Sequence, residues 1–469
     1  MALRKVNTKY GTVIGIPGND PRITVFKGIP YAKAPKGKLR LMAPQKPDPW
    51  EGELLCDKWS DSPVQDIGRY TTPGVAFSED CLKLNIWTPA ESPDEKLPVM
   101  IFFYGGGFNR GDSCYKSYDG EAINHRGVIH VNVNYRVSVL GFLALPELSE
   151  RAEYKVSGNY GLLDQIASIK WVKENISAFG GDPDNITIFG QSAGGSSCRM
   201  LATSPLAKGL FRRTIIMSGG RVCEDIRTME EYQDICHRIM EHLGWTVDDI
   251  LNREAFEVQN NMYRAAAEVL AGMGIKEVFF YRPCVDGYVL PDKDTSAGLF
   301  DGNLDVIMGS VYGDGSVFGG KINGNFENPY DIIRTVAFAP PIAHALRAIR
   351  QGSKPIYTYF IERARPSSGS PMPHGAEIPY FFGTLDRFGD AWTDFDRKFS
   401  EVMLDYITNF AKTGNPNREG LPYWPTYTAE TPVSLNVTDS EILVHNLINS
   451  EDSAYVLDCM IENKEITRK

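Results

Sequence analysis

The chain has 469 residues, 42% of them apolar, and a net charge of −10. This length is enough for a large core, and we expect a single domain over residues 1–469. The acidic balance, with no block of basic residues, argues against nucleic-acid binding. No apolar leader opens the sequence and no run of about eighteen apolar residues follows. We therefore expect no membrane span and a cytoplasmic location. The eight cysteines are scattered without metal-ligand spacing, which predicts free thiols, no metal and no cofactor.

Short β-branched or apolar runs alternate with helical patterns along the chain. Alternation of this kind predicts an α/β fold with a mostly parallel central sheet flanked by helices. Residues from about 224 to 350 are expected to form a largely helical insertion that packs over the sheet and shapes a pocket. The expected strands are 10–16, 23–32, 81–87, 97–104, 128–136, 185–189, 214–220, 304–309 and 355–360, and the expected helices include 162–178, much of 224–275 and 398–413.

The segment from Gly190 to Gly194 has the pattern G-x-S-x-G between a predicted strand and a predicted helix. In the α/β-hydrolases this pattern forms a sharp turn that exposes the serine hydroxyl as a nucleophile. Glycines two positions on either side remove side chains that would collide in such a turn. The start of the following helix directs free N–H groups at the same point. We therefore expect Ser192 to be a catalytic nucleophile.

An oxyanion hole is predicted from three glycines, Gly105 to Gly107, which follow the strand at 97–104. Glycine lets backbone N–H groups approach a substrate closely, and a loop of this kind supplies the oxyanion donors of lipases and esterases. We expect the donors to be Gly106, Gly107 and Ala193, the residue after the serine.

A catalytic serine also needs a base and an orienting acid, which follow it in this fold in the order acid, then histidine. His125 and His130 precede Ser192 and are excluded by this order. The remaining histidines are 237 and 242 on the helical insertion, 344 in another predicted helix, 374 in a loop after a strand, and 445. The loop position favours His374. Asp314, in a glycine-flanked turn, is the favoured acid, with Asp305 and Asp286 as competitors.

Several longer motifs resemble the type-B carboxylesterase family, which includes the cholinesterases and related adhesion proteins. The similarity runs from about Gly11 to Trp424. The chain resembles a bacterial-type member of the family. The motifs that carry it are residues 26–32 (FKGIPYA), 78–82 (SEDCL), 134–136 (NYR), 158–165 (GNYGLLDQ), 179–183 (FGGDP), 374–380 (HGAEIPY) and 409–416 (NFAKTGNP).

The resemblance implies Ser192 as nucleophile, His374 as base and Asp314 as acid. It implies two structural ion pairs, Arg40 with Glu79 and Arg136 with Asp182. It also implies that Glu377 supports the histidine loop and that Ser218 lies near the acid and hydrogen-bonds it.

The chain departs from the family pattern at three places. Aspartate replaces the usual glutamate at position 314, so its loop must come closer to His374. Tyr104 precedes the glycines where histidine is usual. Val64 stands near where secreted members carry a cysteine that pairs with the one matching Cys81, so that disulfide is missing.

These features predict a serine hydrolase that acts on small carboxylic esters through an acyl-serine intermediate. Hydroxycinnamoyl esters, amides and carbamates remain open as substrates of the same residues. A non-catalytic binding protein on this scaffold is a further alternative, although such members lose the serine or its partners. Tyr104, Phe108 and Phe318 are aromatic residues that line either a substrate pocket or the core.

Overall fold

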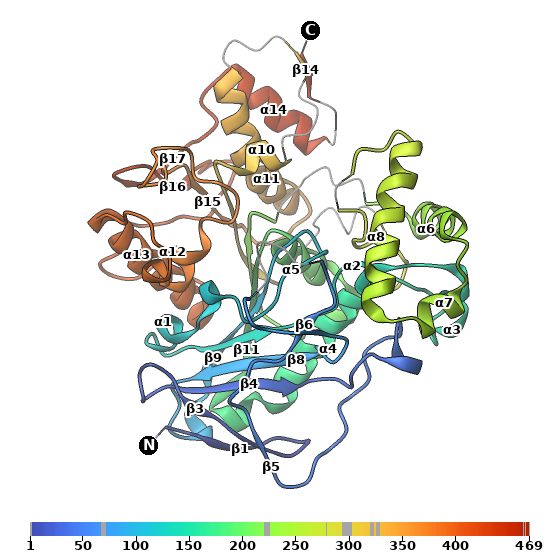
Figure 1. Ribbon diagram of the computed structural model, residues 1–469. Coiled ribbons are helices and arrows are strands. Elements are labelled where there is room, and N and C mark those ends of the chain that lie inside the picture. Colours follow the sequence, from blue (N-terminus) through green and yellow to red (C-terminus); the bar gives the residue numbers. More distant parts are fainter. Residues whose placement is uncertain are drawn as a thin grey trace.

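The computed structural model describes residues 2–66, 72–219, 226–277, 279–292, 303–318, 323–324, 329–462, 464 and 466–468. A sheet of 11 strands runs through the centre of the molecule, and Figure 1 shows helices around it. Seven neighbouring strands, from β16 to β10, are parallel, and antiparallel strands extend the sheet at both edges. The expected mostly parallel α/β sheet is confirmed.

In spatial order the strands of the central sheet are β17 (Ile442–His445), β16 (Ser434–Val437), β15 (Tyr357–Ile361), β13 (Asp305–Val311), β12 (Arg213–Met217), β11 (Gly181–Gln191), β9 (Leu97–Phe103), β10 (Ile129–Val133), β8 (Lys83–Thr88), β4 (Thr24–Pro30) and β3 (Ile16–Pro17). Smaller sheets pair β1 (Lys5–Asn7) and β5 (Glu53–Leu55) with β2 (Thr12–Ile14), β6 (Ser62–Pro63) with β7 (Phe77–Ser78), and β14 (Asn323–Gly324) with β18 (Thr467–Arg468).

The α-helices are α1 (Glu121–Asn124), α2 (Ser138–Phe142), α3 (Pro146–Arg151), α4 (Tyr160–Asn175), α5 (Ala193–Thr203), α6 (Met229–Leu243), α7 (Val247–Asn252), α8 (Ala255–Gly272), α10 (Asp314–Phe318), α11 (Pro329–Arg350), α12 (Ile378–Phe382), α13 (Asp394–Thr413) and α14 (Glu451–Ile461). Short 3-10 turns lie at Gly37–Leu39, Pro93–Glu95, Lys116–Tyr118, Ile176–Phe179, Pro205–Ala207 and Leu385–Arg387. Helices α6 and α13 begin with capping boxes at Thr228 and Thr393, which satisfy backbone N–H groups of the first turn.

Both faces of the sheet are buried, as a doubly wound sheet requires. Strand β9 shows the alternation directly. Val99, Ile101 and Phe103 belong to the larger core cluster, with residues of α4, α5, α8 and α11. Met100 and Phe102 belong to the second cluster, with residues of α12 and α13. Successive side chains of a strand point to opposite faces, so each face acquires its own layer of helices.

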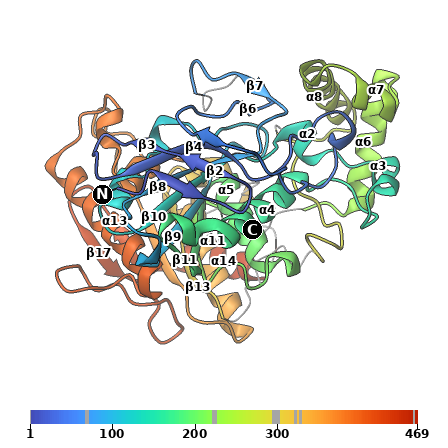
Figure 2. The same ribbon diagram turned by 90° about the horizontal axis from the view of Figure 1, so that it is seen from below.

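The region from 224 to 350 contains the helices α6, α7, α8 and α11 and also the predicted strand at 304–309, which is confirmed as β13. Helices α6, α7 and α8 form a group at one side of the molecule, opposite α12 and α13 (Figures 1 and 2). Strand β13 then returns the chain to the central sheet between β12 and β15. The alternating apolar run at 304–309 is what directs this return, because it fits a strand buried on both faces.

One stretch of α11, Ile332–Arg350, is long and apolar enough to cross a membrane, but 72% of its most apolar window is buried. It packs against α14 and against β13 and β15, and it contains Pro340 and Pro341. These contacts are those of a core helix of the fold.

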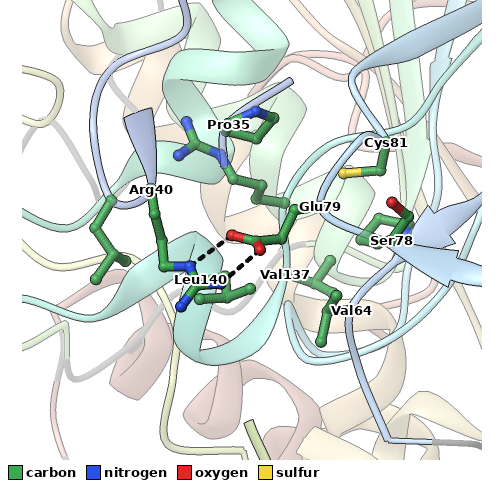
Figure 3. A pocket seen from close by; sticks show the side chains of 11 residues that line it. Pro35, Arg40, Val64, Ser78, Glu79, Cys81, Val137 and Leu140 are labelled. Carbon is green, nitrogen blue, oxygen red and sulfur yellow. Dashed lines mark hydrogen bonds and ion pairs between the residues drawn. The ribbon is translucent and has the colours of Figure 1, made fainter. Parts of the chain in front are cut away.

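The predicted ion pair between Arg40 and Glu79 is confirmed (Figure 3). The guanidinium donates to both carboxylate oxygens at 2.6 Å and also to the carbonyl oxygens of Ile250 and Arg253. It therefore fastens the N-terminal segment to α7. The cavity beside this pair holds about 10 Å³, room for one water molecule. Val64 and Cys81 both line it, and Cys81 is a free thiol.

The predicted pair between Arg136 and Asp182 is wrong. Arg136 donates instead to both oxygens of Asp164 in α4, at 2.7 and 2.8 Å, and both side chains are buried. The strand register explains the error. Arg136 follows the carboxyl end of β10, whereas Asp182 lies at the amino end of β11. The two ends are roughly 20 Å apart along the sheet. Asp182 instead accepts a hydrogen bond from the N–H of Asp184.

Candidate active site

Ser192 lies at the sharp turn between β11 and α5, in the backbone conformation φ 56°, ψ −123°. Its N–H donates to the carbonyl oxygen of Met217 at 2.9 Å. A Cβ atom on Gly194 would overlap the carbonyl oxygen of Phe103, and one on Gly190 would overlap Gly194. Only glycine allows these three backbone segments to meet, and their contact holds the serine in its strained position.

The structure brings Ser192, His374 and Asp314 together in one hydrogen-bonded chain. The Nε2 atom of His374 lies 2.8 Å from Ser192 Oγ, and its Nδ1 atom lies 2.5 Å from Asp314 Oδ1. His374 comes from the loop between β15 and α12, and Asp314 is the first residue of α10, directly after β13. The serine hydroxyl, a base and an orienting acid thus meet at the carboxyl edge of the parallel strands.

The loops of Asp314 and His374 are closely nested. The N–H of Gly313 donates to the carbonyl oxygen of Met372 at 2.9 Å. A Cβ atom on Gly313 would lie 2.6 Å from the backbone nitrogen of His374. This close approach lets the shorter aspartate reach the imidazole, as the sequence required. The second oxygen of Asp314 accepts the N–H of Val311 at 3.1 Å, which fixes the carboxylate.

The two competing acids, Asp305 and Asp286, form contacts with other groups. Asp305 lies at the amino end of β13, away from Ser192, and its carboxylate is 2.8 Å from Lys354. Asp286 accepts the N–H groups of Tyr288, Val289 and Leu290 and so caps a turn. His237 and His242 of α6 lie beside glutamates on the surface.

The expected contact between Ser218 and the acid is replaced by a contact with Glu377. Ser218 Oγ donates to Glu377 Oε1 at 2.7 Å. Glu377 is fully buried, and burial together with the charge of Asp314 raises the pKa of Glu377 to about 7. The carboxyl of Glu377 thus lies close enough to the Asp314–His374 pair for its charge to act on that pair. Ser218 sits one residue past β12, so its hydroxyl meets the histidine loop rather than the tip of β13.

Two opposing effects set the pKa of His374. Burial of the ring disfavours its charged form. The hydrogen bond and charge of Asp314, with the charge of Glu377, outweigh this, so the pKa of His374 is raised above 6.5. An imidazole of this kind stabilises the positive charge it acquires when it takes a proton from a serine.

The glycine loop lies directly against the serine. A Cβ atom on Gly105 would come within 2.9 Å of Ser192 Cβ. Gly106, Gly107 and Phe108 then have positive φ values of 117°, 64° and 64°. Among the described residues, none accepts a hydrogen bond from the N–H of Gly106 or Gly107. The N–H of Ala193, at the start of α5, has no partner within its helix. These N–H groups are thus available to an oxyanion.

Tyr104 anchors the start of this loop. Its ring stacks on Tyr135 at 4.4 Å between centroids, and each hydroxyl donates to the other residue's carbonyl oxygen. Tyr104 and Phe108 are buried, so both are core residues at this point. The side chain of Phe318 lies outside the described residues.

Two neighbours of the site were not predicted. Gln191 is buried, and its Nε2 atom lies 3.5 Å from His374 Nε2. Its place next to the serine in the G-x-S-x-G pattern was the only sequence signal. The nesting of Gly313 against His374 had no signal, because the two residues are 61 positions apart.

Known proteins resemble this chain over nearly its whole length. The carboxylesterase family model matches residues 2–332 and 325–456. The para-nitrobenzyl esterase of Bacillus subtilis (strain 168) is 32% identical, over 95% of this chain and 97% of the relative. The fumonisin B1 esterase of Sphingopyxis macrogoltabida is 31% identical, over 90% of this chain and 84% of the relative.

Solved structures give the same result. A PNB esterase structure superposes with a TM-score of 0.81 at 29% identity, over 97% of this chain and 100% of the other. A carboxylesterase of Geobacillus stearothermophilus superposes with a TM-score of 0.77 at 30% identity, over 94% of this chain and 97% of the other. The chain therefore belongs to the carboxylesterase family, has the α/β-hydrolase fold and is a carboxylic-ester hydrolase.

Proposed function

We propose that this enzyme cleaves carboxylic esters through an acyl-Ser192 intermediate. His374 takes the proton of Ser192 as the hydroxyl attacks the ester carbonyl, and then gives that proton to the leaving alcohol. A water molecule then attacks the acyl group while His374 takes its proton. The bond between the acyl group and Ser192 breaks, the proton passes from His374 to Ser192, and the carboxylic acid is released. Asp314 orients the imidazole and stabilises its positive charge. The single observation that carries this proposal is the hydrogen-bonded chain at 2.8 and 2.5 Å from Ser192 to Asp314.

The N–H groups of Gly106, Gly107 and Ala193 serve as the oxyanion donors in this proposal. The negative charge that develops on the carbonyl oxygen needs donors that are already in place. The positive φ of 64° at Phe108, a conformation that is unusual for a residue other than glycine, supports this assignment, since such strain is kept where the surrounding structure holds it for a purpose. Loss of one such donor costs roughly a hundredfold in kcat.

The test is turnover of 4-nitrophenyl butyrate and a 4-nitrobenzyl ester, the second chosen because a relative is named for that class. Ser192→Ala should lose about 10⁶-fold in kcat. Ser196→Ala, in the first turn of α5, is the matched control, since among the described residues its hydroxyl donates to the carbonyl oxygen of Gly219 and to no other group. A folded wild type that turns over neither ester, nor reacts with a fluorophosphonate probe at Ser192, would contradict the proposal and favour a non-catalytic binding protein.

A further inference from the structure

Arg110 lies at the end of the glycine loop, beside the proposed oxyanion donors. Its N–H donates to the carbonyl oxygen of Gly106 at 3.2 Å. Its guanidinium lies over the ring of Phe279, 5.4 Å from the ring centre. Phe279 in turn packs on Gly107, where a Cβ atom would come within 2.8 Å of the ring. The guanidinium, the aromatic ring and the oxyanion glycines therefore form one contiguous group along the glycine loop.

Arg110 has no anionic partner among the residues that the structure describes. Within the described part of the chain no carboxylate forms an ion pair with Arg110, and its Nε atom is buried without an acceptor. Three buried arginines that do pair with carboxylates show the difference. Arg40, Arg136 and Arg363 each hold a carboxylate with two hydrogen bonds. A buried donor without an acceptor destabilises a protein, and a guanidinium is shaped to bind a carboxylate with two parallel bonds.

A buried polar chain fixes the residue before Arg110. The side-chain amide of Asn109 donates to the carbonyl oxygens of Gly107 and Tyr281, at 2.6 and 3.1 Å. Its Oδ1 atom accepts the hydroxyl of Ser138 at 3.4 Å, and that hydroxyl accepts from Gln259 of α8 at 2.8 Å.

Ser138 itself has the unusual φ of 54°, and its N–H holds the carbonyl oxygen of Phe108 at 2.7 Å. The chain thus ties the glycine loop to the helical group at the side of the molecule (Figure 1). Strain kept in a fully buried serine is typical of a functional loop that must not move. These contacts therefore fix the backbone that carries Arg110.

We propose that Arg110 binds a carboxylate carried by the substrate, so that the preferred substrates are esters with a free carboxylate in their acyl or alcohol part. This inference rests on the function proposed above. An ester whose carbonyl oxygen sits against Gly106 and Gly107 places its remaining atoms beside Phe279 and Arg110. The carboxylate then supplies the acceptor that Arg110 lacks, while the aliphatic spacer lies on the Phe279 ring. Arg110 takes no part in bond making or breaking.

The test compares isosteric pairs of esters. For the acyl side, mono-4-nitrophenyl glutarate is compared with 4-nitrophenyl pentanoate. For the alcohol side, 4-acetoxybenzoate is compared with 4-methylphenyl acetate. In wild type we expect kcat/KM to favour the anionic member of one pair. Arg110→Gln should lower that anionic-to-neutral ratio by about 10- to 100-fold, the usual size of a charge-assisted contact. Arg110→Lys should retain part of the preference, because it keeps the charge but loses the fork.

The matched control is Arg212→Gln. Arg212 directly precedes β12, at the end of the sheet opposite Ser192, so this change alters the net charge equally without touching the site. It should leave both ratios unchanged. Raising the salt concentration should reduce the wild-type ratio and leave that of Arg110→Gln constant.

The outcomes separate this inference from the proposed function. If wild type hydrolyses the neutral esters and Arg110→Gln leaves both ratios unchanged, the inference is overturned and the proposed function stands. If no ester is hydrolysed, binding of monomethyl glutarate to the Ser192→Ala protein, measured by titration calorimetry, decides the matter. Loss of that binding in the Arg110→Gln double variant supports an anion site, and equal or absent binding rejects it.

Discussion

The two halves of the active site are held in place by different forces. The half with Ser192 is fixed by backbone packing: Gly190, Gly194 and Gly105 bring β9, β11 and α5 into contact at distances that no side chain permits. The half with His374 and Asp314 depends on charge and hydrogen bonds as well as on the close approach of Gly313 to the histidine loop, next to a buried Glu377 whose pKa is raised to about 7. We infer that the serine half is insensitive to pH, whereas the acid–base half is where pH and small loop shifts act.

The largest effect in the acid–base half is expected from Asp314→Asn. The amide cannot stabilise the imidazolium and favours the wrong tautomer of His374. We expect kcat to fall by about 10³- to 10⁴-fold with little change in KM. Steady-state kinetics on 4-nitrophenyl butyrate measure this. Asp305→Asn is the control, and if that variant loses activity while Asp314→Asn keeps it, Asp305 is the acid.

A smaller loss is expected from Gly313→Ala. The new Cβ atom would lie 2.6 Å from the backbone nitrogen of His374 and must push the histidine loop away. A displacement of about 1 Å in a catalytic group costs roughly 10- to 100-fold in kcat. Gly389→Ala is the matched control, because a Cβ atom there meets open space. Equal activity of the two variants would mean that the nesting of the loops has no role in positioning His374.

The smallest effect is expected from Glu377→Gln, and it appears in the pH profile. The free imidazole is the active form, so kcat/KM should rise with pH through the pKa of His374, which Asp314 and Glu377 raise from its ordinary value. Removing the Glu377 charge removes one of the contributions that raise this pKa. The midpoint of the acidic limb should therefore move down, by a few tenths of a unit to about one unit. A midpoint that stays fixed or rises would show that Glu377 is neutral whenever His374 titrates. Ser196→Ala, a change in the half of the site that contains Ser192, should not shift the midpoint of the acidic limb.

Much of this site was predictable, because its parts lie in local patterns. The G-x-S-x-G turn, the glycine loop and the order of acid and histidine each depend on residues close in sequence, and the structure brings these residues together. The sheet was predictable for the same reason, since buried parallel strands form continuous apolar runs.

The side-chain pairings that the sequence did not predict depend on strand register and on contacts between residues far apart in the sequence. Asp182 was paired with Arg136 although the two lie at opposite ends of their strands, and Asp164 one turn into α4 holds that arginine instead. Ser218 was placed on the acid, but the end of β12 presents it to Glu377. Local propensity carries no information on such pairings.

The nesting of Gly313 against His374 has a consequence for how this family can change its acid. Glutamate at position 314 would add a methylene group to a contact that is already 2.5 Å long, and the loops would have to separate. The separation would open the space that now excludes a side chain at position 313. We predict that either substitution alone lowers activity and that the two together restore part of it, which would be epistasis between the two positions. An evolutionary path between an aspartate and a glutamate acid would thus pass through position 313 as well as position 314.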